Sequence, residues 1–147
     1  MNIFLKCYNM TQENKELLLK DLCARLPYGV KVAFFNEDLD YHSEPKTLTG
    51  IECINNLNYS RLEDEDGNTT IVEFIKPYLF PLSSMTEEQK KELEDTLINL
   101  SLKSLSDEIN GEDVATYEID FYNKHHIDYR GLIPQGLVLD ATYLNIY

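Results

Sequence analysis

The feature that most constrains the fold of this chain is an amphipathic segment, TQENKELLLKDLCARL (11–26), that runs into a proline. Its leucines recur at the i, i+4 spacing that places side chains on one face of an α-helix, at Leu18, Leu22 and Leu26. Thr11 suits the N-cap position. Pro27 disfavours a helical residue before it and so ends the helix. A helix over 11–26 therefore has to bury its leucine face against the segments that follow.

Segments with the alternation of β-strands follow this helix. The candidate strands are Val30–Phe35, Lys46–Ile54, Leu57–Glu63 and Thr69–Lys76. Asp66-Gly67 separates the last two and is a favoured hairpin pair. Pro77 is predicted to end the last strand or to lie at a sheet edge.

Two further helices are predicted in the second half of the chain. One of two overlapping capping boxes, at 84–87 and 86–89, starts the first, which runs to about Leu102. Its inward stripe is predicted to consist of Leu93, Thr96, Leu97 and Leu100. The second runs from Asp113 to about His126 and is expected to bury Ile119 and Tyr122. Gly131 suits a left-handed stop near its end. A short strand over 137–139 and an irregular tail follow.

This order of elements predicts an α+β fold. We expect an antiparallel sheet of about four strands, packed with the N-terminal helix and the two helices of the C-terminal half. The length of 147 residues fits a single domain.

The charge of the chain limits its partners. The formal net charge is −13, and the stretch 107–120 has six acids and no base. Such a surface repels phosphate backbones, so direct nucleic-acid binding is not expected. The acids either solvate the surface or form a nucleic-acid mimic that blocks a basic groove on another protein.

The apolar runs and the cysteines of the chain predict its cellular compartment. No apolar run reaches the roughly 20 residues that span a bilayer, and Ile3–Leu5 is too short for a signal peptide. A cytoplasmic protein without a membrane partner is expected. Cys7, Cys23 and Cys53 lack metal-binding spacing and predict free, mostly buried thiols. Cys23 is expected on the apolar face of its helix, where thiolate formation is disfavoured.

The stretch DFYNKHHIDYRGLIP (120–134) carries the candidate site. His125, His126, Asp128 and Arg130 are residue types used in acid–base catalysis and metal binding. However, adjacent helical residues point about 100° apart, so the two histidines do not easily clasp one ion. The spacing favours a helix end, where the helix dipole favours a charged histidine. A small enzyme or a ligand- or metal-binding protein that uses these four residues remains the alternative.

Other motifs do not point to an enzyme. Asp64, Asp66 and Asn68 match the first ligands of an EF-hand loop, but Thr69 and Ile75 replace its glycine and its glutamate. A hairpin tip is predicted there instead. No P-loop, GxGxxG, GxSxG or HExxH motif is present. We therefore predict no resident cofactor and no metal.

Three blocks carry a family resemblance: LLLKDLCARLPYGV (17–30), KPYLFPLSSMTEEQKKEL (76–93) and DFYNKHHIDYRGLIPQGLVLDAT (120–142). They resemble uncharacterised small acidic proteins of gut Bacteroides-type bacteria and their phages and mobile elements. The resemblance runs from about Met10 to the C-terminus and implies no activity, cofactor or catalytic residue. Relatives that begin with a Met-Thr pair imply that residues 1–9 are an N-terminal extension, or the result of a mis-set start, before a domain over 10–147.

These observations favour a non-enzymatic role. The chain is small, acidic and poor in motifs, and its ten tyrosines suit partner recognition. We expect an accessory or inhibitor protein of a phage or mobile element that binds another protein.

Overall fold

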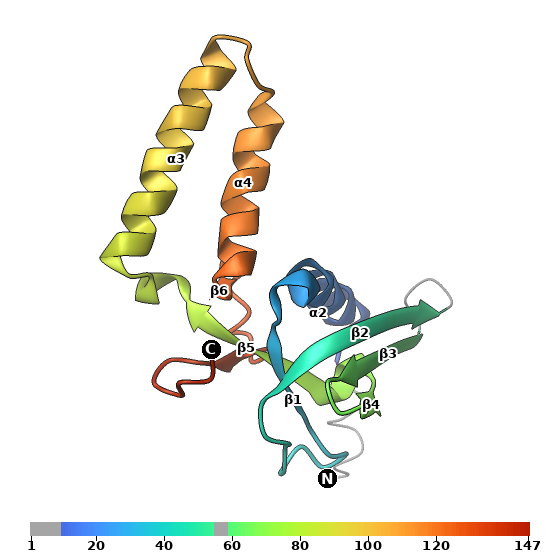
Figure 1. Cartoon of the computed structure of the whole chain (residues 1–147). Helices are drawn as coiled ribbons and strands as arrows, with labels where there is room; N and C mark the ends of the chain where they lie inside the picture. Colours follow the sequence, from blue (N-terminus) through green and yellow to red (C-terminus); the bar gives the residue numbers. More distant parts are fainter. Residues whose placement is uncertain (1–9, 55–58) are drawn as a thin grey trace.

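The computed structural model describes residues 10–54 and 59–147 (Figure 1). Within these residues the chain forms three α-helices and a seven-stranded sheet, which confirms the α+β class. The sheet is larger than the four antiparallel strands expected, and it is mixed because its last two strands pair in parallel with β5. The expected N-terminal extension and Cys7 lie outside the described residues.

Helix α2 (Gln12–Arg25) confirms the first predicted helix. The Thr11 side chain accepts a hydrogen bond from the Asn14 amide at 3.1 Å and caps the helix. A 3-10 turn (Leu26–Tyr28) follows, and the chain reverses at Gly29, whose φ of +68° is a conformation open to glycine without a Cβ clash. The first strand begins two residues later.

The sheet has the order β4-β3-β2-β1-β5-β6, with β7 also paired to β5. Its strands are β1 (Lys31–Phe34), β2 (Lys46–Ile54), β3 (Tyr59–Asp64), β4 (Thr69–Thr70), β5 (Ile75–Pro81), β6 (Ile127–Asp128) and β7 (Leu139–Asp140). The predicted turn between β3 and β4 is confirmed. Asp64 Oδ1 accepts hydrogen bonds from the amides of Asp66 and Asn68, both at 2.9 Å, and Gly67 has a φ of +82°. That arrangement is a hairpin tip.

The predicted strand over 69–76 is wrong in its extent. Only Thr69 and Thr70 pair with β3, because a 3-10 turn (Val72–Phe74) interrupts the strand. The Val72 amide donates instead to the Ser60 hydroxyl at 3.1 Å. Strand β5 then continues through Pro77, which lies opposite Val32 and does not end the strand.

The main core lies between α2 and one face of the sheet. Its buried side chains include Leu18, Leu19, Leu22, Val32, Leu48, Leu62, Leu79 and Leu132. The alternation along the strands sends Ala33 and Tyr78 to the opposite face, where they pack with Ala141. The C-terminal tail, expected to be irregular, thus covers the second face of the sheet.

Helices α3 (Glu87–Leu105) and α4 (Gly111–Lys124) form a hairpin between β5 and β6 that projects away from the sheet (Figure 1). We call the segment 86–125, which contains both helices and their caps, the arm. Thr86 and Gln89 form the capping box at its start, which confirms the second of the two overlapping boxes. The Asn110 side chain caps α4.

Helix α4 differs in detail from the predicted helix over 113–126. It starts and ends two residues earlier, and it buries Phe121 and Asn123. Ile119 is 43 % exposed and Tyr122 is half-buried, so the predicted burial of these two residues is wrong. Leu93 and Leu97 of α3 pack with Phe121 in a second, smaller core.

Candidate functional site

The segment from the end of α4 through β6 to the turn after it, which we call the α4–β6 junction, contains all four sequence-predicted site residues. His125 is the C-cap of α4, and His126 takes the left-handed conformation that follows it, with a φ of +59°. The prediction that Gly131 stops this helix is therefore wrong, although Gly131 has a φ of +71° in a later turn. The left-handed residue turns the chain so that β6 can start directly after the helix.

His125 packs against its own helix. Its ring centroid lies 4.5 Å from that of Phe121, and its Nδ1 lies 3.5 Å from the side-chain amide nitrogen of Gln89. The Nε2 atom is buried without a hydrogen-bond partner among the described residues. This imidazole therefore links the start of α3 to the end of α4.

His126 is held in a stack. Its ring lies 3.8 Å from the ring of Tyr147, with only 13° between the two planes. Burial, together with the smaller effects of the charges of Arg25 and His125, lowers the pKa of His126 to about 4. The imidazole is therefore neutral near pH 7 and is not a proton donor there.

Asp128 is occupied by the backbone. Its Oδ1 accepts a hydrogen bond from the Leu132 amide at 2.9 Å, and its Oδ2 accepts one from the Ile133 amide at 2.8 Å. The residue is 5 % exposed. Both carboxylate oxygens thus hold the turn after β6.

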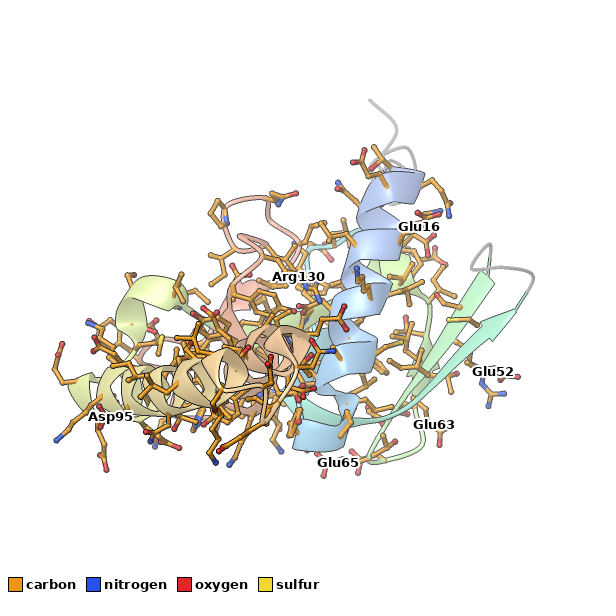
Figure 2. The ribbon with its side chains drawn as sticks, turned by 90° about the horizontal axis from the view of Figure 1, so that it is seen from above. Glu16, Glu52, Glu63, Glu65, Asp95 and Arg130 are labelled. Atoms are coloured by element: carbon orange, nitrogen blue, oxygen red, sulfur yellow. The ribbon has the colours of Figure 1, made fainter. Side chains whose placement is uncertain are left out.

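Arg130 binds a residue of α2. Its Nε donates to Asp21 Oδ1 at 3.2 Å, and its guanidinium lies over the Tyr129 ring, 4.8 Å from the centroid. Figure 2 shows Arg130 beside α2. The guanidinium is therefore engaged with a carboxylate of its own chain.

Two buried charges that the sequence analysis missed complete this cluster. Arg25 and Asp21 are both fully buried, and Arg25 Nε donates to Asp21 Oδ2 at 2.9 Å. The Nη2 atom of Arg25 donates to the Ile127 carbonyl at 2.7 Å. The i, i+4 spacing of the pair was a visible signal, but charged residues are rarely fully buried. The cluster ties α2 to the α4–β6 junction.

The four predicted residues therefore do not converge on a common reactive point. His126 stacks on Tyr147, Asp128 binds two amides and Arg130 binds Asp21. Within residues 10–54 and 59–147, no group of three His, Cys, Asp or Glu side chains is placed to hold a metal ion.

The cysteine prediction needs a correction. Cys23 and Cys53 are both exposed, not buried. Position 23 lies at the margin of the apolar face of α2. Asp21 and Arg25, and not Cys23, take buried positions of this helix. Partial desolvation nevertheless raises the pKa of the Cys23 thiol, and Cys53 raises it further, so thiolate formation is disfavoured as expected.

A groove with an apolar lining lies on the arm and on the segment that directly precedes it. Its volume is about 630 Å³. It is lined by Leu82, Met85, Lys90, Leu93, Glu94, Leu97, Ile98, Ser101, Leu102 and Tyr122. Ile98 is 54 % exposed and Leu102 is 59 % exposed, and Leu105 extends the apolar surface beyond them with 83 % exposure. The sequence analysis assigned α3 an inward stripe and missed this outward one.

The acids of the chain surround the molecule on several elements. Figure 2 shows Glu16 on α2, Glu52 on β2, Glu63 on β3 and Asp95 on α3. Bases are interleaved with the acids in four exposed or half-buried ion pairs: Lys15–Glu73, Lys46–Asp66, Arg61–Glu52 and Lys90–Glu87. This arrangement does not favour a nucleic-acid mimic, whose acids are expected along one face.

Comparison with protein-family models, with curated proteins and with solved structures found no match to this chain. None of the helices in the described ranges has the length and apolar character needed to cross a membrane. The functional assignment therefore depends on the groove and on the α4–β6 junction.

Proposed function

We propose that this chain is a non-enzymatic protein-binding protein whose contact surface is the groove on the arm. We further propose that it acts in the bacterial cytoplasm as an accessory or inhibitor protein of a phage or mobile element. The resemblance of three sequence blocks supports this second part, and the exposed apolar groove supports the first.

The exposure of Ile98 and Leu102 is the observation that carries the proposal. Leu93 and Leu97 already pack the inner face of α3 against α4, so the two outward side chains are not needed to join the helices. Complete burial of one such side chain is worth about 1.5–3 kcal/mol. A contiguous apolar patch with a polar rim is typical of a protein-interaction site.

The α4–β6 junction supports a structural role for the residues that suggested an enzyme. His126, Asp128 and Arg130 are each engaged by groups of the same chain. A substrate would have to displace these contacts before it could reach the side chains.

Site-specific cross-linking tests the proposal. A photoreactive benzoylphenylalanine is placed at Ser101, which lines the groove, and at Glu52 on the distant β2–β3 hairpin as the matched control (Figure 2). In a lysate of a gut Bacteroides-type bacterium, we expect one discrete protein adduct from position 101 and none from position 52. We also expect the pair of substitutions Ile98→Ser and Leu102→Ser to abolish the adduct.

Adducts of equal yield from both positions would contradict the proposal, because they would show random contact. The absence of any adduct from position 101, in a protein with the circular dichroism of the unmodified chain, would also contradict it.

A further inference from the structure

We infer that the groove of the arm binds an amphipathic helix whose flanks are basic. This inference rests on the proposed function, since it names the chemistry of the partner that the groove takes.

The shape of the groove fits a helix. Its α3 lining recurs at helical spacing along one face, at Lys90, Leu93, Glu94, Leu97, Ile98, Ser101 and Leu102. The α3 part of the lining, from residue 90 to residue 102, covers about 18 Å of helix axis. Leu82 and Met85 form one end, and Tyr122 of α4 forms a side wall. An apolar stripe of about 12 residues along a partner helix matches this length, as in other grooves that take amphipathic helices.

The charge around the groove selects basic flanks. The arm has eleven acids and four lysines, a formal charge of −7. Lys90, the one basic residue of the lining, is paired with Glu87 at 3.1 Å. Glu94, also in the lining, has no ion pair within the described residues. Lysines or arginines beside the apolar stripe of a partner would meet uncompensated carboxylates.

The same charge argues against a second copy of this chain as the occupant. Two arms packed together would bring two formal charges of −7 into contact, and like charges across an interface cost free energy. A helix with acidic flanks would meet the same repulsion. Apolar complementarity alone admits all three occupants, and electrostatics favours the basic one.

Three synthetic helical peptides of 16 residues test the inference by fluorescence anisotropy against the full chain. The first has a leucine stripe and lysine flanks, the second has the same stripe with glutamate flanks, and the third has the lysines with the leucines scrambled. We expect the first to bind at least about tenfold more tightly than either other peptide, and its affinity to fall with added salt.

Matched variants separate the two contributions. Ile98→Ser with Leu102→Ser is expected to abolish binding of the first peptide. Glu94→Lys with Asp95→Lys is expected to weaken it by about tenfold or more. The same charge reversal at Glu52 and Glu63, on the β2–β3 hairpin (Figure 2), is expected to leave the affinity within about twofold after correction for net charge.

Each of the other possible results would overturn the inference, and these results can be distinguished from one another. Equal binding of the lysine- and glutamate-flanked peptides would reject the basic partner and leave the groove as a binding site. Equal binding of the scrambled peptide would reject the groove as its site. Sedimentation of the chain as a dimer that the Ile98→Ser and Leu102→Ser pair dissociates would assign the groove to a second copy. Binding of no peptide, together with the cross-link at position 101, would reject the helix and keep the proposed function.

Discussion

Asp21 accepts a hydrogen bond from Arg130, 109 residues further along the chain, at 3.2 Å. Its second carboxylate oxygen accepts one from Arg25 at 2.9 Å. One buried carboxylate therefore binds two guanidinium groups and fixes α2 against the segment that follows β6. The cluster resembles a site in composition, but its geometry joins parts of one chain.

Replacement of Asp21 by asparagine is expected to destabilise the fold by about 3–5 kcal/mol, because Arg25 would remain buried without its counter-charge. Urea denaturation followed by circular dichroism measures the change. Arg130→Met is the matched control and should cost clearly less. Asp21 keeps its hydrogen bond with Arg25 in this variant, and water can reach the site of the Arg130 side chain, which is 16 % exposed. A loss below about 1 kcal/mol for Asp21→Asn would show that the cluster does not contribute to stability.

Asp128→Ala is expected to destabilise the fold by about 2–4 kcal/mol, because two backbone amides would lose their acceptors. Asp128→Asn retains one acceptor oxygen and should cost about half as much. The midpoints of thermal unfolding should follow the order wild type, asparagine, alanine. Unchanged stability in both variants would argue for a chemical role of this carboxylate over a structural one.

The stability of the chain is expected to depend on His126 in acid. The unfolded histidine binds its proton near pH 6.5, whereas the folded one binds it only near pH 4. The unfolded state therefore holds more protons between these values, and the free energy of unfolding falls as the pH drops from 6.5 to 4. The full shift is equivalent to about 3 kcal/mol, and partial exposure reduces this contribution to about 1–2 kcal/mol.

His126→Asn removes this titration and keeps a residue type that tolerates a positive φ. Urea denaturation at a series of pH values should give a flatter profile for this variant than for wild type. His42→Asn, at an exposed position, should leave the profile unchanged. Parallel profiles for wild type and His126→Asn would mean that this imidazole titrates normally.

Tyr147→Phe is expected to destabilise the fold by about 1–3 kcal/mol. The Tyr147 hydroxyl donates to the Tyr78 carbonyl at 2.6 Å and accepts from the Lys31 amide at 2.9 Å. Burial raises its pKa, so the hydroxyl stays protonated and continues to donate. Tyr143→Phe is the control, because Tyr143 is fully exposed, and it should leave the thermal midpoint unchanged. Equal midpoints for the two variants would reject the assigned role of the hydroxyl.

Local signals predicted the helices well. Thr11, the leucine spacing and Pro27 all lie within one segment, so the bounds of α2 could be read from neighbouring residues. The capping box at Thr86 placed the start of α3 in the same way. These signals need no knowledge of distant parts of the chain.

Non-local pairing explains what was missed in the sheet. The partners of β5 include residues 127–128 and 139–140, which lie far away in the sequence. Pro77 suggested an end to the strand because it lacks an amide hydrogen. Parallel pairing at the other end of β5 extends the strand past this proline, and no local pattern reports such pairing.

The spacing predicted the helix end at His125, but the partners of the four candidate residues could not be predicted, for a related reason. The four candidate residues are close in sequence, but their side chains have different neighbours. The backbone turns at His126, which has a positive φ, and Arg130 donates a hydrogen bond to Asp21. The outward stripe on α3 could have been predicted from the sequence. Ile98, Leu102 and Leu105 recur at helical spacing outside the inward stripe, and the excess of apolar residues was the signal.

The chain leaves the sheet at the end of β5 and returns beside it, where the Phe80 amide donates to the His126 carbonyl at 2.8 Å. The two ends of the arm are thus clamped together, and its tip at 106–110 is free of the sheet. Insertion or deletion of one helical turn in both α3 and α4 at the tip would lengthen or shorten the arm by about 5.4 Å. The register of the strands would stay unaltered. Evolution can therefore vary the reach and the binding surface of the arm while the rest of the domain is conserved.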